Sequence, residues 1–444
     1  MGVKCVTDPR LALVRLREVM VDPARFSSET EAVSSYLEPG LSSDKLLAVV
    51  FPRSKLDIQQ VLEVARGNGM SIYTPLPWGL NPPRAGLVMD FRYMADIKGI
   101  DSRNLFLEIE PGVTWEQVTR ELEGRGVRVA LPAAARSPYV LESAMEREVV
   151  LPACGYTNKQ LSTFHAVLAD GREYRSGSDA LANSVAHWRE DGGPNISRAF
   201  TGSRNSFGLP TRAFVFLYPE PEDRKVVVLG FESLLQACEL AARAARSEVG
   251  TEVLLLSKPK AKDALGSAAA VSNWSVVFGL EGSPRQVEYQ EKRLNEYVAE
   301  LKLKSKPGGP KLTGAAFEAL GKPWYAPEVS FGFYTNWSRV RQLSSKVESA
   351  LKGSGNLAQM VIPVKRGASV YVQYDVQEPS GAASEKVKKL LPVICDAGAF
   401  FPNPTGSLAA HIFSRQPAYL KLLKQVSLLL DPDDMLNSGQ VVEV

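Results

Sequence analysis

Side chains that could carry acid–base, nucleophilic or metal chemistry are few in this chain of 444 residues. The chain has three histidines, His165, His187 and His411, and no two of them lie within one helical turn. A metal-binding pair of histidines on one helix face is therefore excluded. The four cysteines lie far apart, without the C-x-x-C spacing of zinc or iron–sulfur sites. We expect reduced thiols, mostly in the core, and no metal centre.

Composition and charge favour a soluble globular protein. Hydrophobic residues make up 45% and charged residues 23%, and 52 Lys+Arg against 49 Asp+Glu give a net charge of +3. No basic stripe or polybasic block is present, so nucleic acid and anionic membranes are not expected partners. The longest apolar stretches fall far short of the roughly 20 residues that cross a bilayer, and no signal-peptide pattern opens the chain. We expect two or three domains and a cytoplasmic protein.

Strands and helices alternate along the first half of the chain. An apolar strand, Leu47–Phe51, precedes a helix that begins after Ser54 and ends at Gly67-Asn68-Gly69. Further strands follow at Met70–Tyr73 and Leu87–Phe91. Asp170-Gly171, between two β-prone runs, predicts a hairpin. The pattern predicts a compact α+β unit.

The pattern changes after a charged, proline-containing connector at residues 219–224. Beyond it, strands alternate with three amphipathic helices up to about residue 395. This order predicts a separate domain built on an antiparallel sheet. The predicted strands are Val226–Gly230, Val253–Leu256, Trp274–Leu280, Glu328–Tyr334 and Val370–Val376.

Six motifs in a fixed order resemble those of FAD-linked oxidases of the vanillyl-alcohol oxidase and glycolate oxidase type. They are Val50–Ser54, Leu87–Phe91, Glu108–Thr114, Val167–Arg172, Phe200–Thr211 and Asp431–Gly439. The resemblance covers about residues 45–220 and 395–444. It implies an α+β fold: a two-part FAD-binding (PCMH-type) domain with an inserted cap domain made of an antiparallel sheet and helices.

The resemblance also implies a domain organisation. Residues 1–45 would form an N-terminal helical extension and residues 46–222 the FAD-binding domain, with two subdomains. Residues 223–395 would form the cap, which carries the substrate site, and residues 396–444 would return to the FAD-binding domain.

A further implication of the resemblance is a bound FAD. Its pyrophosphate would need backbone N–H groups and glycines that permit close approach. The residues that would hold the cofactor are Trp78, Gly79, Leu80, Asn81, Gly112, Ser143, Ala169, Asp170, Gly202, Ser203 and Asn437.

Two loops depart from the family pattern. Prolines between Pro75 and Pro83 replace potential N–H donors, because proline has no N–H. Glu142 and Glu148 stand where glycines are expected, and a carboxylate close to a phosphate is unfavourable. Both departures argue against ordinary FAD binding.

The resemblance places the substrate beside the segment Gly398–Gly406, where Asn403 stands in place of an arginine that would stabilise negative charge. No histidine lies between His187 and His411, so the metal-dependent mechanism of some relatives is not expected. We assign catalytic roles to Tyr374, His411 and Arg415, and the cap residues Arg366 and Tyr371 are further candidates.

Two functions remain open. In the first, the chain is an FAD-dependent oxidoreductase that takes a hydride from an alcohol or 2-hydroxy acid and passes electrons to a partner, since no haem or cluster ligands occur here. In the second, it is a non-catalytic subunit that has lost flavin binding and scaffolds or regulates a catalytic paralogue or an iron–sulfur partner. The altered loops and Asn403 favour the second function, whereas Gly202-Ser203 and Asn437-Ser438-Gly439 favour the first. Because these flavin-side elements persist, the sequence predicts the first function, with the second as the alternative.

Overall fold

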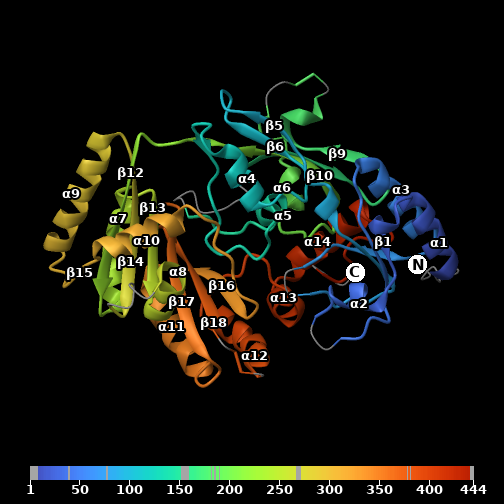
Figure 1. Cartoon of the computed structure of the whole chain (residues 1–444). Coiled ribbons are helices and arrows are strands. Elements are labelled where there is room, and N and C mark those ends of the chain that lie inside the picture. The colour runs from blue at the N-terminus through green and yellow to red at the C-terminus, as the bar shows by residue number, and fades with distance from the viewer. Residues whose placement is uncertain are drawn as a thin grey trace.

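A computed structural model gives the architecture of the chain (Figure 1). It describes residues 9–38, 41–76, 79–151, 160–181, 183–184, 187–189, 191–266, 272–377, 379–380 and 382–440. Helices and sheets build two lobes side by side, one around the first three sheets and one around a single large sheet. The α+β fold expected from the sequence is confirmed, while the domain boundaries stay a prediction.

The first sheet contains the parallel strands β2, β4 and β3, with β1 antiparallel at one edge. Helix α3 follows β2 because Ser54 caps it: its hydroxyl accepts from the Asp57 backbone N–H, and the Asp57 carboxylate accepts in return. The elements are α1 (Pro9–Met20), β1 (Phe26–Ser27), α2 (Thr30–Ser34), β2 (Leu46–Val50), α3 (Lys55–Gly67), β3 (Ser71–Tyr73) and β4 (Gly86–Met89).

The second sheet is antiparallel, in the order β5-β6-β10-β8-β9. The hairpin predicted at Asp170-Gly171 joins β8 to β9, and Gly171 supplies the left-handed φ of +87°. A separate two-stranded pair, β7 and β11, lies beside it. The elements are β5 (Ile97–Asp101), β6 (Phe106–Ile109), α4 (Trp115–Leu122), β7 (Val127–Arg128), α5 (Val140–Met145), β8 (Leu161–Val167), β9 (Glu173–Arg175), α6 (Ser197–Phe200), β10 (Leu209–Phe216) and β11 (Tyr218–Pro219).

The large sheet of the second lobe, called the cap sheet here, has seven antiparallel strands in the order β15-β12-β14-β13-β17-β18-β16. The strands are β12 (Asp223–Phe231), β13 (Glu252–Ser257), β14 (Trp274–Gly282), β15 (Lys306–Pro307), β16 (Ser330–Thr335), β17 (Asn356–Val364) and β18 (Ser369–Gln377). The helices are α7 (Leu234–Arg246), α8 (Lys258–Leu265), α9 (Pro284–Glu300), α10 (Pro310–Leu320), α11 (Trp337–Ala350) and α12 (Ala383–Asp396).

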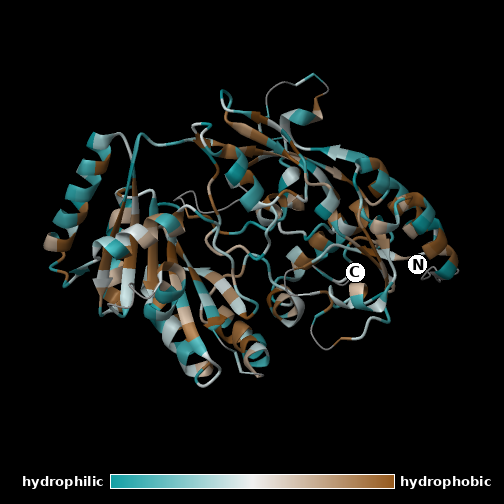
Figure 2. Ribbon diagram, in the orientation of Figure 1, coloured by the Kyte–Doolittle hydropathy of each residue, from teal (hydrophilic) through white to brown (hydrophobic). Residues whose placement is uncertain are grey.

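Helices cover both faces of the cap sheet. The core on one face contains residues of α7, α9, α11 and α12, and the core on the other face contains residues of α8 and α10. Figure 2 shows hydrophobic residues concentrated in the strands, whereas α9 is largely hydrophilic on its outer side. Because both faces are buried, the strands carry nearly continuous apolar runs.

The last segment returns to the first lobe. Helices α13 (Gly406–Phe413) and α14 (Pro417–Leu430) follow the cap, and Leu423 and Val426 of α14 pack on the second-sheet core. Leu436 forms a parallel bridge with Ile72 of β3, and the Asn437 backbone N–H donates to the Ile72 carbonyl at 2.8 Å. Among the described helices, none is long and apolar enough to cross a membrane.

Candidate functional site

A cavity of about 160 Å³ lies between the two lobes and is the candidate site. Its walls come from the loop after β3, the segment after β7, α5 with the residues that follow it, strands β16 and β18 of the cap sheet, α12 and the segment after α12. Small-molecule sites usually measure about 300 Å³ or more, so this cavity is small. It lies between the first lobe and the cap sheet, beside the segment after α12.

Three glutamates line this cavity, and burial raises the pKa of each one. The pKa of Glu142 rises to about 8 and that of Glu148 to about 7. The Ser137 hydroxyl donates to Glu142 at 2.7 Å, and the Arg136 backbone N–H donates to Glu148 at 2.9 Å. At neutral pH much of this cluster is therefore protonated and can donate as well as accept hydrogen bonds.

Arg147 occupies a backbone position that suits glycine. Its φ is +58°, whereas Glu142 lies inside α5 and Glu148 has no positive φ. A Cβ added at Gly202 would collide with the Arg147 guanidinium, which donates to the Pro402 carbonyl at 2.8 Å.

Asn403 closes the same corner of the site. Its side-chain oxygen accepts from Arg147 at 2.9 Å, and its amide N–H₂ donates to the Glu146 carbonyl. The Asn403 side chain thus ties the segment after α12 to the loop after α5. Asn403, which was predicted to lie beside substrate, lines the cavity and also joins two parts of the protein.

Most backbone N–H groups described in the loop after β3 donate hydrogen bonds to other groups of the protein. The N–H of Thr74 donates to Asn437 Oδ1 at 2.8 Å, that of Gly79 to Leu76 at 3.0 Å, and that of Leu80 to Tyr36 at 2.8 Å. The two prolines of this loop have no N–H. Of the described residues from Thr74 to Leu80, Leu76 alone keeps an unbonded backbone N–H.

The other residues predicted to hold the cofactor in this loop are Gly79, Asn81 and Trp78. Gly79 has φ +85°, and a Cβ there would lie 2.5 Å from the Glu38 nitrogen, so this glycine allows close packing inside the lobe. Asn81 is exposed, and Trp78 lies outside the described residues. The described loop does not fit a pyrophosphate, which needs several converging N–H groups.

Asn437, one of the predicted cofactor residues, has a side-chain hydrogen-bond donor without a partner. It is 1% exposed and adopts φ +46°, and its Oδ1 accepts from Thr74. Its Nδ2 is buried and has no hydrogen-bond partner in the described structure. A buried unsatisfied amide is costly and is a feature of ligand sites as well as of strained ones.

Three other predicted cofactor residues make contacts within the protein. Ser143 accepts from Trp115 Nε1 at 3.2 Å, and Ser203 donates to the Phe200 carbonyl at 2.7 Å. Gly112 packs so closely against the Phe91 carbonyl that a Cβ would not fit. These residues support the fold directly.

Ala169 and Asp170 belong to the β8–β9 turn. The Ala169 carbonyl accepts from the Arg66 guanidinium of α3, and Asp170 pairs with the exposed Arg172 at 2.5 Å. The structure therefore places Asp170 at a surface turn and not in the cavity.

Tyr371, and not Tyr374, reaches the cavity from β18. The Tyr374 hydroxyl donates to Ser344 of α11 at 2.9 Å, on the opposite face of the sheet. The Tyr371 hydroxyl donates to Gln373 at 2.6 Å, and Gln373 donates to Asp375 at 3.0 Å. Burial raises the Tyr371 pKa, so this hydroxyl stays protonated.

A buried lysine completes this row of side chains. Lys260 of α8 donates to Asp375 Oδ2 at 2.6 Å, and the two side chains are 6% and 2% exposed. The lysine, missed in the sequence, is 115 residues from its partner, so no local signal identifies it.

The other catalytic candidates lie outside the cavity. His411 and Arg415 both pair with Asp396 at the end of α12, the former at 2.8 Å. Arg366 lies on an exposed turn and pairs with Glu248. These three residues are not brought together with Tyr371.

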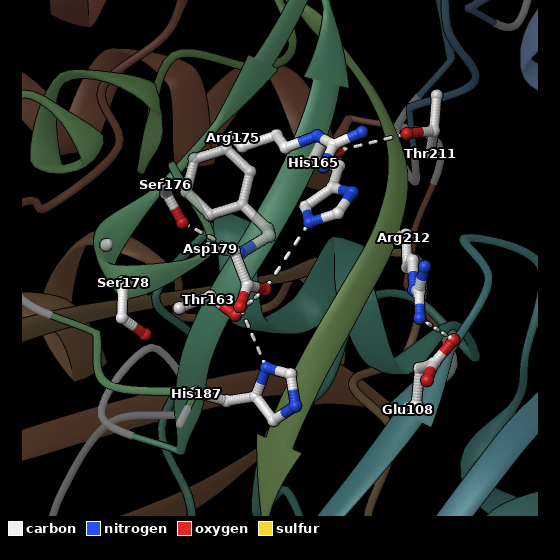
Figure 3. A network of polar contacts seen from close by, with 12 residues as sticks. Glu108, Thr163, His165, Arg175, Ser176, Ser178, Asp179, His187, Thr211 and Arg212 are labelled. Atoms are coloured by element: carbon white, nitrogen blue, oxygen red, sulfur yellow. Dashed lines mark hydrogen bonds and ion pairs between the residues drawn. The ribbon is translucent and has the colours of Figure 1, made fainter. Parts of the chain in front are cut away.

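The remaining two histidines share one carboxylate (Figure 3). His187 Nδ1 lies 2.9 Å and His165 Nε2 3.3 Å from Asp179, and Thr163 donates to Asp179 at 2.6 Å. These contacts hold the pKa of Asp179 at about 2 despite its burial. Among the described residues, no group of three or more His, Cys, Asp or Glu side chains could hold a metal ion.

Comparison with known proteins identifies the class. Residues 46–177 match the family model of an FAD binding domain. The glycolate oxidase subunit GlcD of Bacillus subtilis is 29% identical over 204 residues, which cover 43% of this chain and 41% of that protein. A D-lactate dehydrogenase of Archaeoglobus fulgidus is 21% identical over 427 residues, 89% of this chain and 91% of that protein.

Solved structures agree with this class at the level of the fold. A 4-ethylphenol oxidase from Gulosibacter chungangensis superposes with a TM-score of 0.83 at 16% identity, covering 97% of this chain and 96% of that chain. A p-cresol methylhydroxylase gives 0.81 at 16% identity with the same coverage. The match at residues 46–177, the relatives and the shared fold support the resemblance to FAD-linked oxidases that the six motifs suggested.

Proposed function

We propose that this chain belongs to the FAD-linked oxidase family and is a non-catalytic subunit, which keeps the fold without holding FAD and assembles with a catalytic flavoprotein. The observation that carries the proposal is the loop after β3. Its described N–H groups are bonded internally at Thr74, Gly79 and Leu80. A pyrophosphate there would have to break those bonds or remain poorly solvated, and either costs free energy.

The second loop supports the same proposal. Burial already raises the pKa of Glu146, and its Oε2 has no hydrogen-bond partner. An added phosphate would raise the cost of ionising this carboxyl further. The Arg147 guanidinium covers Gly202, one of the glycines that would admit a cofactor. Two loops thus resist the same group for different physical reasons.

The names of relatives support a role within an assembly. The matched Bacillus subtilis protein is named a subunit of glycolate oxidase. A 4-cresol dehydrogenase flavoprotein subunit of Pseudomonas putida is 26% identical over 163 residues. We expect the partner of this chain to be a paralogous flavoprotein or an iron–sulfur subunit, and the cytoplasmic location stays a prediction.

A second candidate is the family activity itself: hydride removal from an alcohol or 2-hydroxy acid, with electrons passed to a partner. The relatives named glycolate oxidase subunit and D-lactate dehydrogenase support it, and so does the unused buried donor of Asn437. In this candidate the described residues would act by holding substrate. Tyr371 would accept a hydrogen bond, because its own proton goes to Gln373, and Glu142 would hold or release a proton near neutral pH.

The visible spectrum and FAD-dependent thermal stability of the purified full-length chain separate the two candidates. We expect a colourless protein whose Tm does not rise with FAD beyond the change that ADP gives, since a ligand that binds only the folded state must raise Tm. A stoichiometric flavin band, or a rise specific to FAD, would overturn the proposal and favour the oxidoreductase.

A gain-of-binding variant strengthens the test. Arg147→Gly removes the side chain that covers Gly202 and suits the φ of +58°. Combined with Pro75→Gly, it should increase FAD-dependent stabilisation if these residues block the site. The control is Gly314→Ala in α10, far from both loops in the chain and with open space for a Cβ.

A further inference from the structure

A second cavity, of about 300 Å³, lies between the lobes on the side of β7 and β11. We call it the β7 cavity. One wall comes from α4, β7, β11 and the segment after β7, and the other from β12, the start of β13 and the end of α10. None of its lining residues lines the acidic cavity of the candidate site.

Apolar side chains form most of its wall. They come from both lobes, and each of those named next is buried or half-buried in the fold. They are Leu122, Val127, Val129, Ala130, Leu131 and Leu320. A hydrophobic lining with a few fixed polar groups is the usual character of a small-molecule site, and the volume reaches the lower end of the usual range, about 300 Å³.

Four charged side chains form a closed network at this cavity. Arg128 of β7 binds Glu281 of β14 through two hydrogen bonds of 2.6 and 2.5 Å. Arg224 binds Glu252 at 2.7 Å and lies 3.0 Å from Glu281. Both glutamate side chains are only 5% exposed. Two cations and two anions leave this buried network neutral, and the two other carboxylates of the lining, Glu123 and Glu220, are exposed to solvent.

The charge balance restricts the ligand. A charged head group placed here would leave one buried charge without a partner, which is strongly unfavourable. A neutral molecule would not disturb the three ion pairs and would bury its surface against the apolar wall.

We propose that the β7 cavity is a binding site for an uncharged, mostly apolar small molecule of one or two ring systems. Because both lobes supply the wall, the ligand binds only when they are docked as described here and stabilises that arrangement. The site is independent of flavin binding, so its test stands whether or not the proposed function holds.

The probe for the test is N-phenyl-1-naphthylamine, a neutral two-ring-system fluorophore that brightens in apolar surroundings. Titration into the purified full-length chain should show saturable binding at one site. Two variants block the cavity: Ala130→Phe fills it from the wall, and Thr119→Trp obstructs it from a partly exposed position on α4. Each should weaken binding at least about tenfold, a change of 1.4 kcal/mol.

Ala418→Phe is the matched control, since it adds the same ring at an exposed position on α14 and should leave binding unchanged. Thr119→Trp needs no repacking of the core, so it keeps the test valid if Ala130→Phe fails to fold. Absence of saturable binding would overturn the proposal. So would undiminished binding in Thr119→Trp, because the probe would then occupy another surface, such as the exposed leucines of α14.

Discussion

Glu142→Gln should change how the stability of the protein depends on pH. The carboxyl of Glu142 is buried beside the acidic cavity, and burial raises its pKa from 4.5 to about 8. A proton held more tightly in the folded state stabilises that state fully below pH 4.5, and this stabilisation is lost as the pH rises through about 8. Glutamine keeps the shape of the neutral acid and can still accept from Ser137, but it does not titrate.

The size of the effect follows from the two pKa values. The difference between 8 and 4.5 corresponds, at about 1.4 kcal/mol per pKa unit, to about 5 kcal/mol. Glu146 and Glu148 also raise the pKa of Glu142 through their charges, so part of this figure belongs to the cluster. For the single variant we therefore expect a change of about 3–5 kcal/mol in the pH dependence.

The assay is urea unfolding of wild type and Glu142→Gln at pH values from about 5 to 8. The free energy of unfolding of the wild type should fall across this range, and that of the variant should fall by about 3–5 kcal/mol less. Glu63→Gln, at an exposed position of α3, is the control and should follow the wild type. If Glu142→Gln and wild type lose stability in parallel, Glu142 ionises freely in the folded protein and the description of the acidic cavity is wrong.

Four further substitutions test other parts of the fold. Asp179→Asn should cost about 2 kcal/mol of stability at neutral pH and little near pH 2. The pKa of Asp179 is lowered from 3.8 to about 2, so the stabilisation given by its carboxylate is lost as the pH falls through that value. Thermal melts at the two pH values measure the difference. Lys260→Met should cost about 3–5 kcal/mol in urea unfolding, since it leaves a buried carboxylate unpaired; a cost below about 1 kcal/mol would show that water reaches the pair. Gly332→Ala should destabilise the protein, because the added Cβ would collide with the Tyr371 hydroxyl. Gly314→Ala has open space for the Cβ in α10 and should stabilise the protein by about 1 kcal/mol. Equal effects of the two substitutions in thermal melts would contradict the packing described.

Much of the fold follows from local sequence signals. The Ser54 cap, the Asp170-Gly171 turn and the strand patterns each act through contacts a few residues apart, and all are present in the structure. The order of the six motifs then supplied the long-range arrangement that no local pattern could give. These features could therefore be predicted before any coordinates were known.

The candidate site was harder to predict because its contacts are long-range. The alternation along Val370–Val376 separates Tyr371 from Tyr374 correctly, but it does not say which face meets the cavity, since helices cover both faces of the cap sheet. The sequence predicted catalytic roles for His411 and Arg415, but both side chains pair with Asp396 in the structure. The hydrogen bonds made by the loop N–H groups, such as that from Leu80 to the Tyr36 carbonyl, likewise appear only in three dimensions.

The bridge between Ile72 and Leu436 has a consequence for synthesis on the ribosome. The first lobe lacks the contacts of residues 435–437 until the cap and the segment after it have also been made. At about 5–20 residues per second, β3 must wait tens of seconds for its partner, while the cap can fold as a contiguous stretch. The nascent first lobe is thus exposed to chaperones and proteases for longer than the cap. A deletion of residues 431–440 should leave the first lobe without the contacts that complete β3.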